Sequence, residues 1–296
     1  MKIIKLLRLD NLVLLALVLF AFRYGFLMQQ DGLVMVLNEW QYALMVLACI
    51  LVGAGAYLIN TIADTDKPEV ISESAGYNLY ATLNIAAAGI GYYLADHIGN
   101  STFVAIFIVA AAIAYWYATN LKQTPIISNL IIALVIPIAV FTIAVFNLYP
   151  LTKYGYQPLV PTLFSLITDF AIITYAFAVL YSFTKDMATT NSDYNAGNST
   201  LPILLGKERT SKLLTILMLI PIGLIFYYTN QYLKDLLYAV GYGLLFIIGP
   251  LIYYIIKMWG ATSQKEYVRL ATVLKLILFF TGLSVIIITY NIQHNA

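Results

Sequence analysis

Few side chains in this sequence can do acid–base or metal chemistry, so their positions are informative. Only 14 of the 296 residues are acidic, and four of these are aspartates that fall in two polar segments. The four are Asp64, Asp66, Asp186 and Asp193. Each segment also carries a lysine, Lys67 in the first and Lys185 in the second. Proteins commonly hold Mg²⁺ with one or two carboxylates together with substrate phosphates, and nearby cations stabilise a departing diphosphate. The segments therefore predict a site for Mg²⁺ and a diphosphate, unless they are simply solvated surface loops.

The spacing within each segment brings its polar groups together. Asn60 and Asp64 are four residues apart and project from one face if a helix continues through them. Asp66 joins Asp64 on one side if the chain is extended there. Asp186 and Asp193 are seven residues apart, which is two helical turns, so they also share a face of a helix.

The composition restricts the class of protein that can carry these groups. Apolar residues make up 61% of the chain and charged residues only 10%, with a mean hydropathy of +0.85. A soluble domain usually has about a quarter charged residues, so a soluble enzyme is excluded. The net charge of +2 is too small to indicate a nucleic-acid partner. The single cysteine, Cys49, excludes an intrachain disulfide.

Nine apolar runs follow one another along the chain, and we interpret them as membrane-spanning helices with boundaries good to about three residues. They cover residues 12–28, 42–59, 75–95, 103–118, 126–146, 159–183, 213–228, 236–256 and 270–290. Three longer polar loops remain, at 60–74, 185–212 and 257–269, and the first two hold the aspartates.

The basic residues predict the orientation of these spans. In a nine-span arrangement only Arg23, Lys153 and Lys234 lie on one side, which leaves 13 of the 16 basic residues on the other. Because cytoplasmic loops carry the excess of Lys and Arg, we expect the N-terminus and the aspartate loops in the cytoplasm and the C-terminus outside.

The two polar segments together resemble the UbiA-type intramembrane prenyltransferases. In the first segment the matching residues are Asn60, Asp64 and Lys67-Pro68. In the second they are Lys185-Asp186, Asp193, Gly197, Thr200-Leu201-Pro202 and Leu205-Gly206. Further matches are Arg8 and Asn11 before the first span, Tyr117, Lys122, Pro125 and Asn129 between the fourth and fifth, and Lys275 in the ninth. The resemblance covers the whole chain.

This resemblance implies a single all-α domain over residues 1–296, with nine transmembrane helices around a central cavity. It implies Mg²⁺-dependent transfer of a prenyl group from an allylic polyprenyl diphosphate to a small-molecule acceptor. The acceptor classes are a quinone precursor, haem, glycerol phosphate or a similar alcohol. The implied catalytic residues are Asn60, Asp64, Asp186 and Asp193, and the implied metal ligands are Asp64, Asp66, Asp186 and Asp193. The implied diphosphate contacts are Lys67, Lys122, Lys185 and Asn129.

The sequence also departs from the family pattern at two positions. Asp66 stands two positions after Asp64, whereas the next Asp of the family motif stands four positions after the first. Thr189 stands where the family has the middle Asp of the second motif. Two alternatives stay open, the first because of these departures and the second because of Asp169 and of Pro137, Pro221 and Pro250 inside the apolar runs. One is a homologue without catalysis that binds or moves isoprenoid lipids, and the other is a small-solute transporter.

Three individual residues also keep two interpretations each. Lys122 either binds phosphate or extends to the membrane interface, and Asn129 either serves the site or makes an interhelical hydrogen bond. Asp169, inside the sixth apolar run, is either a structural carboxylate or a polar floor of the substrate cavity.

Overall fold

The computed structural model describes residues 6–63, 71–152 and 159–294, and every ordered element within these ranges is helical. Eight of the described helices are long and apolar enough to cross a membrane. A further helix, α4 (Glu73–His97), is 25 residues long and lies where the third span is predicted, but it is more polar than the others. The prediction of an all-α polytopic membrane protein is therefore confirmed.

The helices match the predicted spans closely. They are α2 (Leu9–Gly25), α3 (Glu39–Ile62), α4, η2 (Ser101–Val104) with α5 (Ala105–Thr119), α6 (Ile127–Ile132) with α7 (Val135–Asn147) and α8 (Tyr149–Thr152), α9 (Leu159–Asn195), α11 (Lys207–Leu217) with α12 (Leu219–Tyr228), α13 (Leu237–Gly243) with α14 (Gly249–Gly260), and α15 (Gln264–His294). Shorter elements are η1 (Leu27–Gln29), η3 (Leu121–Gln123), α10 (Leu201–Leu205) and the π-helical segments η4 (Thr229–Leu233) and η5 (Leu244–Ile248).

Prolines explain why three of the predicted spans are interrupted. A proline inside a helix has no N–H for the carbonyl four residues earlier, and its ring clashes with that carbonyl. Pro137 lies four residues after the break between α6 and α7, and Pro221 four residues after the end of α11. Pro250 lies four residues after Phe246, in the middle of η5, where the helix widens to π geometry.

The second aspartate segment is mostly helical, and this corrects its assignment as a loop over 185–212. α9 continues for 12 residues beyond the predicted end of the sixth span and stops at Asn195. α10 and the start of α11 occupy most of the remainder. Asp186 and Asp193 therefore lie on the same face of one helix, as their spacing predicts.

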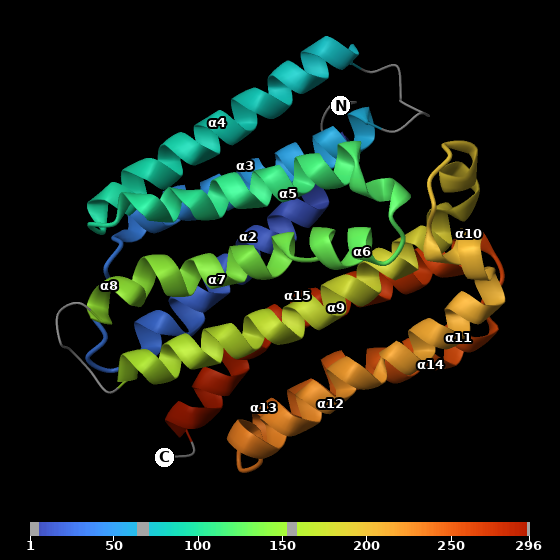
Figure 1. Ribbon diagram of the computed structural model, residues 1–296. Coiled ribbons are helices and arrows are strands. Elements are labelled where there is room, and N and C mark those ends of the chain that lie inside the picture. The colour runs from blue at the N-terminus through green and yellow to red at the C-terminus, as the bar shows by residue number, and fades with distance from the viewer. Residues whose placement is uncertain (1–5, 64–70, 153–158, 295–296) are drawn as a thin grey trace. The chain divides into compact units, whose positions relative to one another are not determined.

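The described chain forms two compact units. Of the described residues, unit 1 contains 6–20, 32–63, 71–121, 134–152 and 159–171, and unit 2 contains 21–31, 122–133 and 172–294. In unit 1, α3 runs beside α4 and α5 (Figure 1). Asn38 begins α3 with a capping box to Gln41. At Gly55 a Cβ would come within 2.6 Å of the Asn84 side-chain amide, so a larger residue where α3 meets α4 would require that side chain to move.

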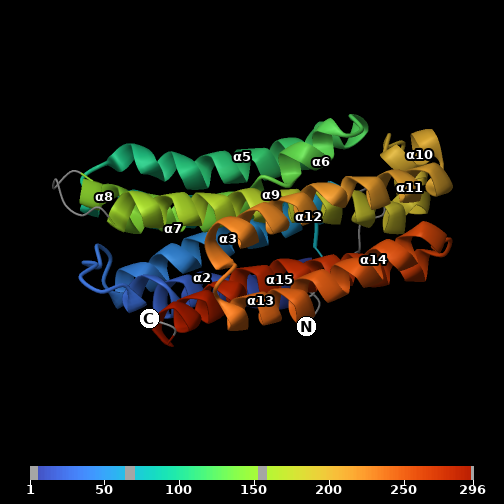
Figure 2. The same ribbon diagram turned by 90° about the horizontal axis from the view of Figure 1, so that it is seen from below.

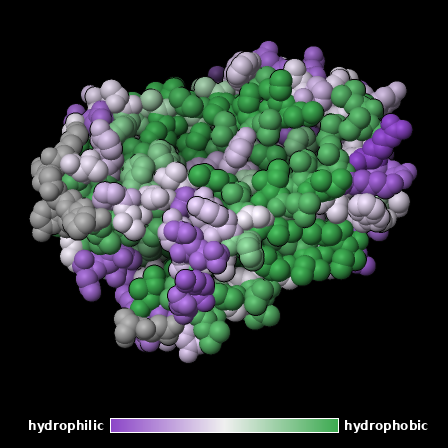
Figure 3. Space-filling view, turned by 60° about the horizontal axis from the view of Figure 1, so that its bottom comes forward, coloured by the Kyte–Doolittle hydropathy of each residue, from purple (hydrophilic) through white to green (hydrophobic). Residues whose placement is uncertain are grey.

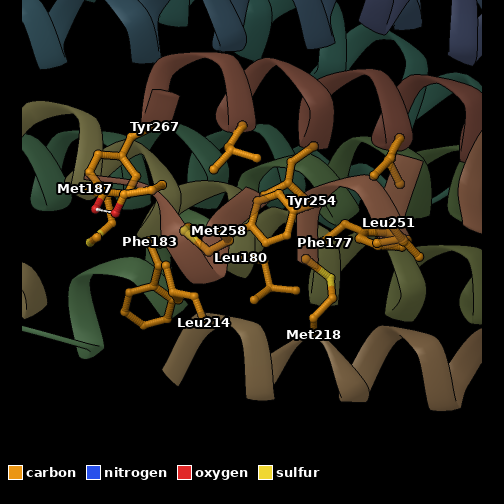
Figure 4. Packing of buried hydrophobic residues seen from close by; sticks show 14 of the residues in the cluster. Phe177, Leu180, Phe183, Met187, Leu214, Met218, Leu251, Tyr254, Met258 and Tyr267 are labelled. Carbon is orange, nitrogen blue, oxygen red and sulfur yellow. Dashed lines mark hydrogen bonds between the residues drawn. The ribbon is translucent and has the colours of Figure 1, made fainter. Parts of the chain in front are cut away.

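Unit 2 is built around a cluster of buried side chains from α9, α11, α14 and α15, shown in Figure 4. Figure 2 shows α14 and α15 side by side. Two buried tyrosines add specific bonds to this packing. The hydroxyl of Tyr254 is 2.6 Å from that of Thr184 in α9, and the hydroxyl of Tyr267 donates to the Ala261 carbonyl. The Tyr254 bond fixes α14 against the part of α9 that immediately precedes Lys185, and the Tyr267 bond ties α15 to the end of α14.

The outer surface agrees with residence in a bilayer. The face drawn in Figure 3 carries a broad area of hydrophobic side chains, with the hydrophilic groups gathered in separate patches. Many large apolar side chains on the helices are exposed, among them Leu237, Phe226 and Ile85. A surface of this kind is compatible with contact to lipid.

Candidate active site

The most strongly enclosed charged group of the second motif is Asp186. It lies on α9 in unit 2, and only 8% of its surface is exposed. Its Oδ2 accepts a hydrogen bond of 2.7 Å from the side-chain amide of Asn129. A buried carboxylate needs such partners, because burial without them is costly.

Asn129 comes from α6, and its whole side chain is committed to the protein. It is 1% exposed, and its amide donates to the Ser182 hydroxyl at 3.0 Å as well as to Asp186. Its Oδ1 accepts from the Ser128 hydroxyl at 3.3 Å. Asn129 was expected to bind the diphosphate. The structure shows the interhelical bond of the other interpretation, through which Asn129 orients Asp186, and contact with the diphosphate stays a prediction.

The turn that precedes α6, and so positions Asn129, has an uncommon backbone geometry. Ile126 has φ 70° and ψ −58°, and the Ile127 N–H donates to the Pro125 carbonyl at 2.8 Å. These values define a γ-turn with a positive central φ, which is a strained geometry for a β-branched residue. The hydroxyl of Tyr175 on α9 donates a hydrogen bond of 3.2 Å to the Leu130 carbonyl of α6.

Two lysines supply positive charge to this site. Lys185 precedes Asp186 on α9, and Lys122 lies in η3, seven residues before Asn129. Both side chains are half-buried. Their charges act favourably on the Asp186 carboxylate, whereas the charge of Asp193 acts against it. The structure therefore brings Lys122, Lys185 and Asp186 into one electrostatic neighbourhood with Asp193.

Asp193 is half-buried near the end of α9 and accepts two hydrogen bonds from neutral groups. Its Oδ2 accepts from the Thr189 hydroxyl at 2.6 Å, and its Oδ1 accepts from the Asn198 amide at 3.2 Å. Sequence reasoning assigned Thr189 only as a departure and gave Asn198 no role. A signal for Asn198 was present, since it follows Gly197 directly after a helical run, and glycine commonly ends helices.

The donor set of this motif fits Mg²⁺. Asp186 and Asp193 offer oxygen ligands from one helix face, and Mg²⁺ prefers oxygen ligands and usually completes its shell with water and phosphate. Within the described ranges, no three His, Cys, Asp or Glu side chains gather as a metal site. The predicted ligands Asp64 and Asp66 and the predicted diphosphate contact Lys67 lie outside the described residues.

The two remaining candidates lie in unit 1. Asn60 is half-buried, two residues before the end of α3, where the first aspartate segment begins. Asp169 is half-buried in the first part of α9. The roles of both residues remain predictions.

Comparison with known proteins gives results for structure only. No protein-family model matches the chain, and no curated protein matches it. A solved digeranylgeranylglyceryl phosphate synthase, studied in membranes, is 17% identical over 97% of both chains, with a TM-score of 0.64. A UbiA homologue from Aeropyrum pernix K1 is 16% identical over 96% of both chains, with a TM-score of 0.62.

A UbiA homologue from Archaeoglobus fulgidus, solved with DMAPP and Mg²⁺ bound, also matches. It is 18% identical over 97% of this chain and 99% of its own, with a TM-score of 0.62. Because each likeness extends over nearly the whole length of both chains, this protein has the fold of the UbiA homologues.

Proposed function

We propose that this chain is a UbiA-type prenyltransferase, which moves the prenyl group of an allylic polyprenyl diphosphate to a small-molecule acceptor. The observation that carries the proposal is the buried Asp186, held by Asn129 and acted on by the charges of Lys185 and Lys122. The likeness to a fold that binds DMAPP and Mg²⁺ in one homologue supports it. From the basic-residue distribution we place the site on the cytoplasmic side.

Different residues would contribute to different steps of the reaction, which begins with ionisation of the substrate. The bond between the allylic C1 and oxygen breaks, and its electron pair leaves with the diphosphate. Lys185 and Lys122 would bind phosphate oxygens, where their charges would stabilise the leaving group most as negative charge grows on it. The acceptor then forms a bond to C1 and gives up a proton.

Asp186 and Asp193 would hold Mg²⁺ from the second motif, and Asp64 and Asp66 from the first. When bound, Mg²⁺ supplies positive charge to the departing diphosphate. Asn129 holds the Asp186 carboxylate through a hydrogen bond and so acts as a positioning residue. Asn60 would orient the first motif in a similar way.

Turnover by the purified full-length chain in detergent tests the proposal. The protein is supplied with labelled allylic diphosphates of several lengths, Mg²⁺, and acceptors from the quinone-precursor, haem, glycerol-phosphate and simple-alcohol classes. Wild type should transfer the label to one acceptor class, and Asp186→Ala combined with Asp193→Ala should abolish transfer. Glu208→Gln is a matched control, because Glu208 is an exposed acid on α11 whose partner is Lys212. Transfer that survives the double substitution would overturn the assignment.

A second candidate function is binding of isoprenoid diphosphates without transfer. It is favoured by Thr189, which occupies the position of a family carboxylate and donates a hydrogen bond to Asp193. The same assay separates the two functions. Saturable binding of a labelled diphosphate that is lost in Asp186→Ala, with no product from any acceptor, would favour the second candidate.

A further inference from the structure

The end of α9 returns the chain onto Asp193. Gly197 has φ +74°, and its N–H donates to the Tyr194 carbonyl at 3.1 Å. The N–H of Asn198 donates to the Asp193 carbonyl at 2.9 Å. This pair of bonds is the Schellman arrangement, in which a glycine in the left-handed region reverses the chain after a helix. It places the side chain of Asn198 directly over the Asp193 carboxylate.

The bond from the Asn198 side chain is additional to helix capping. The backbone of Asn198 already completes the cap through the Asp193 carbonyl. Its side-chain amide makes a separate bond of 3.2 Å to Oδ1 of the same residue. The helix end therefore supplies one donor to the Asp193 carboxylate that the helix itself does not require.

Thr189 supplies the second donor, and a comparison with its neighbour shows why this is informative. The hydroxyl of Thr190 lies 3.0 Å from the backbone carbonyls of Asp186 and Met187, the usual partners of a helical threonine. The hydroxyl of Thr189 has such a carbonyl too, that of Lys185 at 3.1 Å, yet it lies only 2.6 Å from Oδ2 of Asp193. A hydroxyl has one proton, and the shorter bond to a charged acceptor is the stronger one.

Both donors leave the charge of Asp193 in place. Within the described residues Asp193 makes no ion pair, and both hydrogen bonds come from neutral groups. Each oxygen of a carboxylate can accept a second partner. Asp193 is therefore held in one orientation on both oxygens while it still presents a negative charge and free lone pairs.

We propose that Thr189 and Asn198 are positioning residues that fix the Asp193 carboxylate for a divalent cation, and that Thr189 replaces a ligand of the family pattern by a donor to the remaining one. This inference rests on the proposed function. Residues that hydrogen-bond a ligating carboxylate typically change metal affinity 10–100-fold when they are lost. A purely structural role in the helix would not affect metal affinity in this selective way.

The test measures the Mn²⁺ concentration needed for half-maximal binding of dimethylallyl S-thiolodiphosphate to the full-length protein, by titration calorimetry. Thr189→Val removes the hydroxyl at nearly constant volume and should raise this concentration about tenfold or more. Thr189→Ser keeps the hydroxyl and should stay close to wild type. Thr190→Val is the matched control on the same helix and should also stay close to wild type.

Asn198→Ala provides an independent variant outside the helix and should raise the Mn²⁺ requirement like Thr189→Val. Thermal unfolding of each variant verifies that it is folded. An unchanged Mn²⁺ requirement in both Thr189→Val and Asn198→Ala, with wild type binding the analogue, would overturn this inference alone. Absence of Mn²⁺-dependent binding in wild type would overturn the proposed function and this inference with it.

Discussion

At the residue scale, the contact between Asn129 and Asp186 joins two segments that are 57 positions apart in the chain. Asn129→Ala removes a donor from a buried carboxylate and leaves its orientation unspecified. We expect turnover to fall about 10–100-fold, because loss of a partner of a ligating group typically has an effect of this size. The measurement is kcat and KM for the allylic diphosphate at saturating Mg²⁺.

Ser182→Ala is the control for this prediction. It removes the other acceptor of the Asn129 amide, at 3.0 Å, and leaves the bond to Asp186 in place. Its turnover should remain within a small factor of wild type. If both variants lose turnover equally, Asn129 serves the packing of α6 on α9 and does not position the carboxylate.

What the sequence could predict at this scale depends on sequence separation. Asp186 and Asp193 are close in the chain, so helical periodicity was enough to place them on one face. The bond from Asn129 to Asp186 depends on how α6 packs on α9, and periodicity contains no such information. Thr189 and Asn198 lie near Asp193 in the chain, but only the geometry of the helix end shows that their side chains turn to it.

At the element scale, we expect glycine substitutions at two neighbouring residues to have opposite effects on stability: Ile126 in the strained turn and Ile127 in the first turn of α6. Ile126→Gly relieves a positive φ that costs about 1–3 kcal/mol for such a residue, and part of the gain is lost to the greater freedom of glycine in the unfolded chain. We expect a higher midpoint of thermal unfolding in detergent.

Ile127→Gly is the matched control, since Ile127 is similarly exposed but begins α6. Glycine in a helix costs about 1 kcal/mol relative to good helix formers, so the midpoint should fall. A fall in both variants would mean that the Ile126 side chain contributes more by its contacts than its backbone costs by strain.

The boundaries of the elements show where pattern reasoning stops. The length of an apolar run reflects the part of a helix that lies in lipid, and not the length of the whole helix. It therefore located the spans, but it ended the sixth span 12 residues before the end of α9. Pro137, Pro221 and Pro250 are visible in the sequence and mark the three interrupted spans. The sequence does not show which proline breaks a helix and which one produces a π-helical segment, and only the structure distinguishes these outcomes.

At the scale of the whole molecule, composition alone was sufficient for the fold class. With 10% charged residues the chain has too few ionisable groups for a water-exposed surface, and eight described helices are long and apolar enough to span a membrane. α4 is not among these eight, because it carries Asn78, Asn84 and Asp96 along its length. Its length of 25 residues still suffices to cross a bilayer.

The charge distribution gives the remaining prediction at this scale, which is the orientation in the membrane. Arg23, Lys153 and Lys234 are the only basic residues on one side of a nine-span arrangement, against 13 on the other. A C-terminal alkaline phosphatase fusion expressed in bacteria should therefore be active, and a C-terminal green fluorescent protein fusion should be dark. The same reporters placed after residue 209, next to Lys207 and Arg209, should show the reverse pattern.

A tag at the N-terminus tests whether α4 crosses the membrane. If α4 lay on the membrane surface, one crossing fewer would separate the N-terminus from residue 209. The reporters at residue 209 and at the C-terminus would still report opposite sides of the membrane, but the N-terminus would then lie on the same side as the C-terminus. An N-terminal tag that is accessible from outside would thus contradict the nine-span arrangement, even with both fusions behaving as expected.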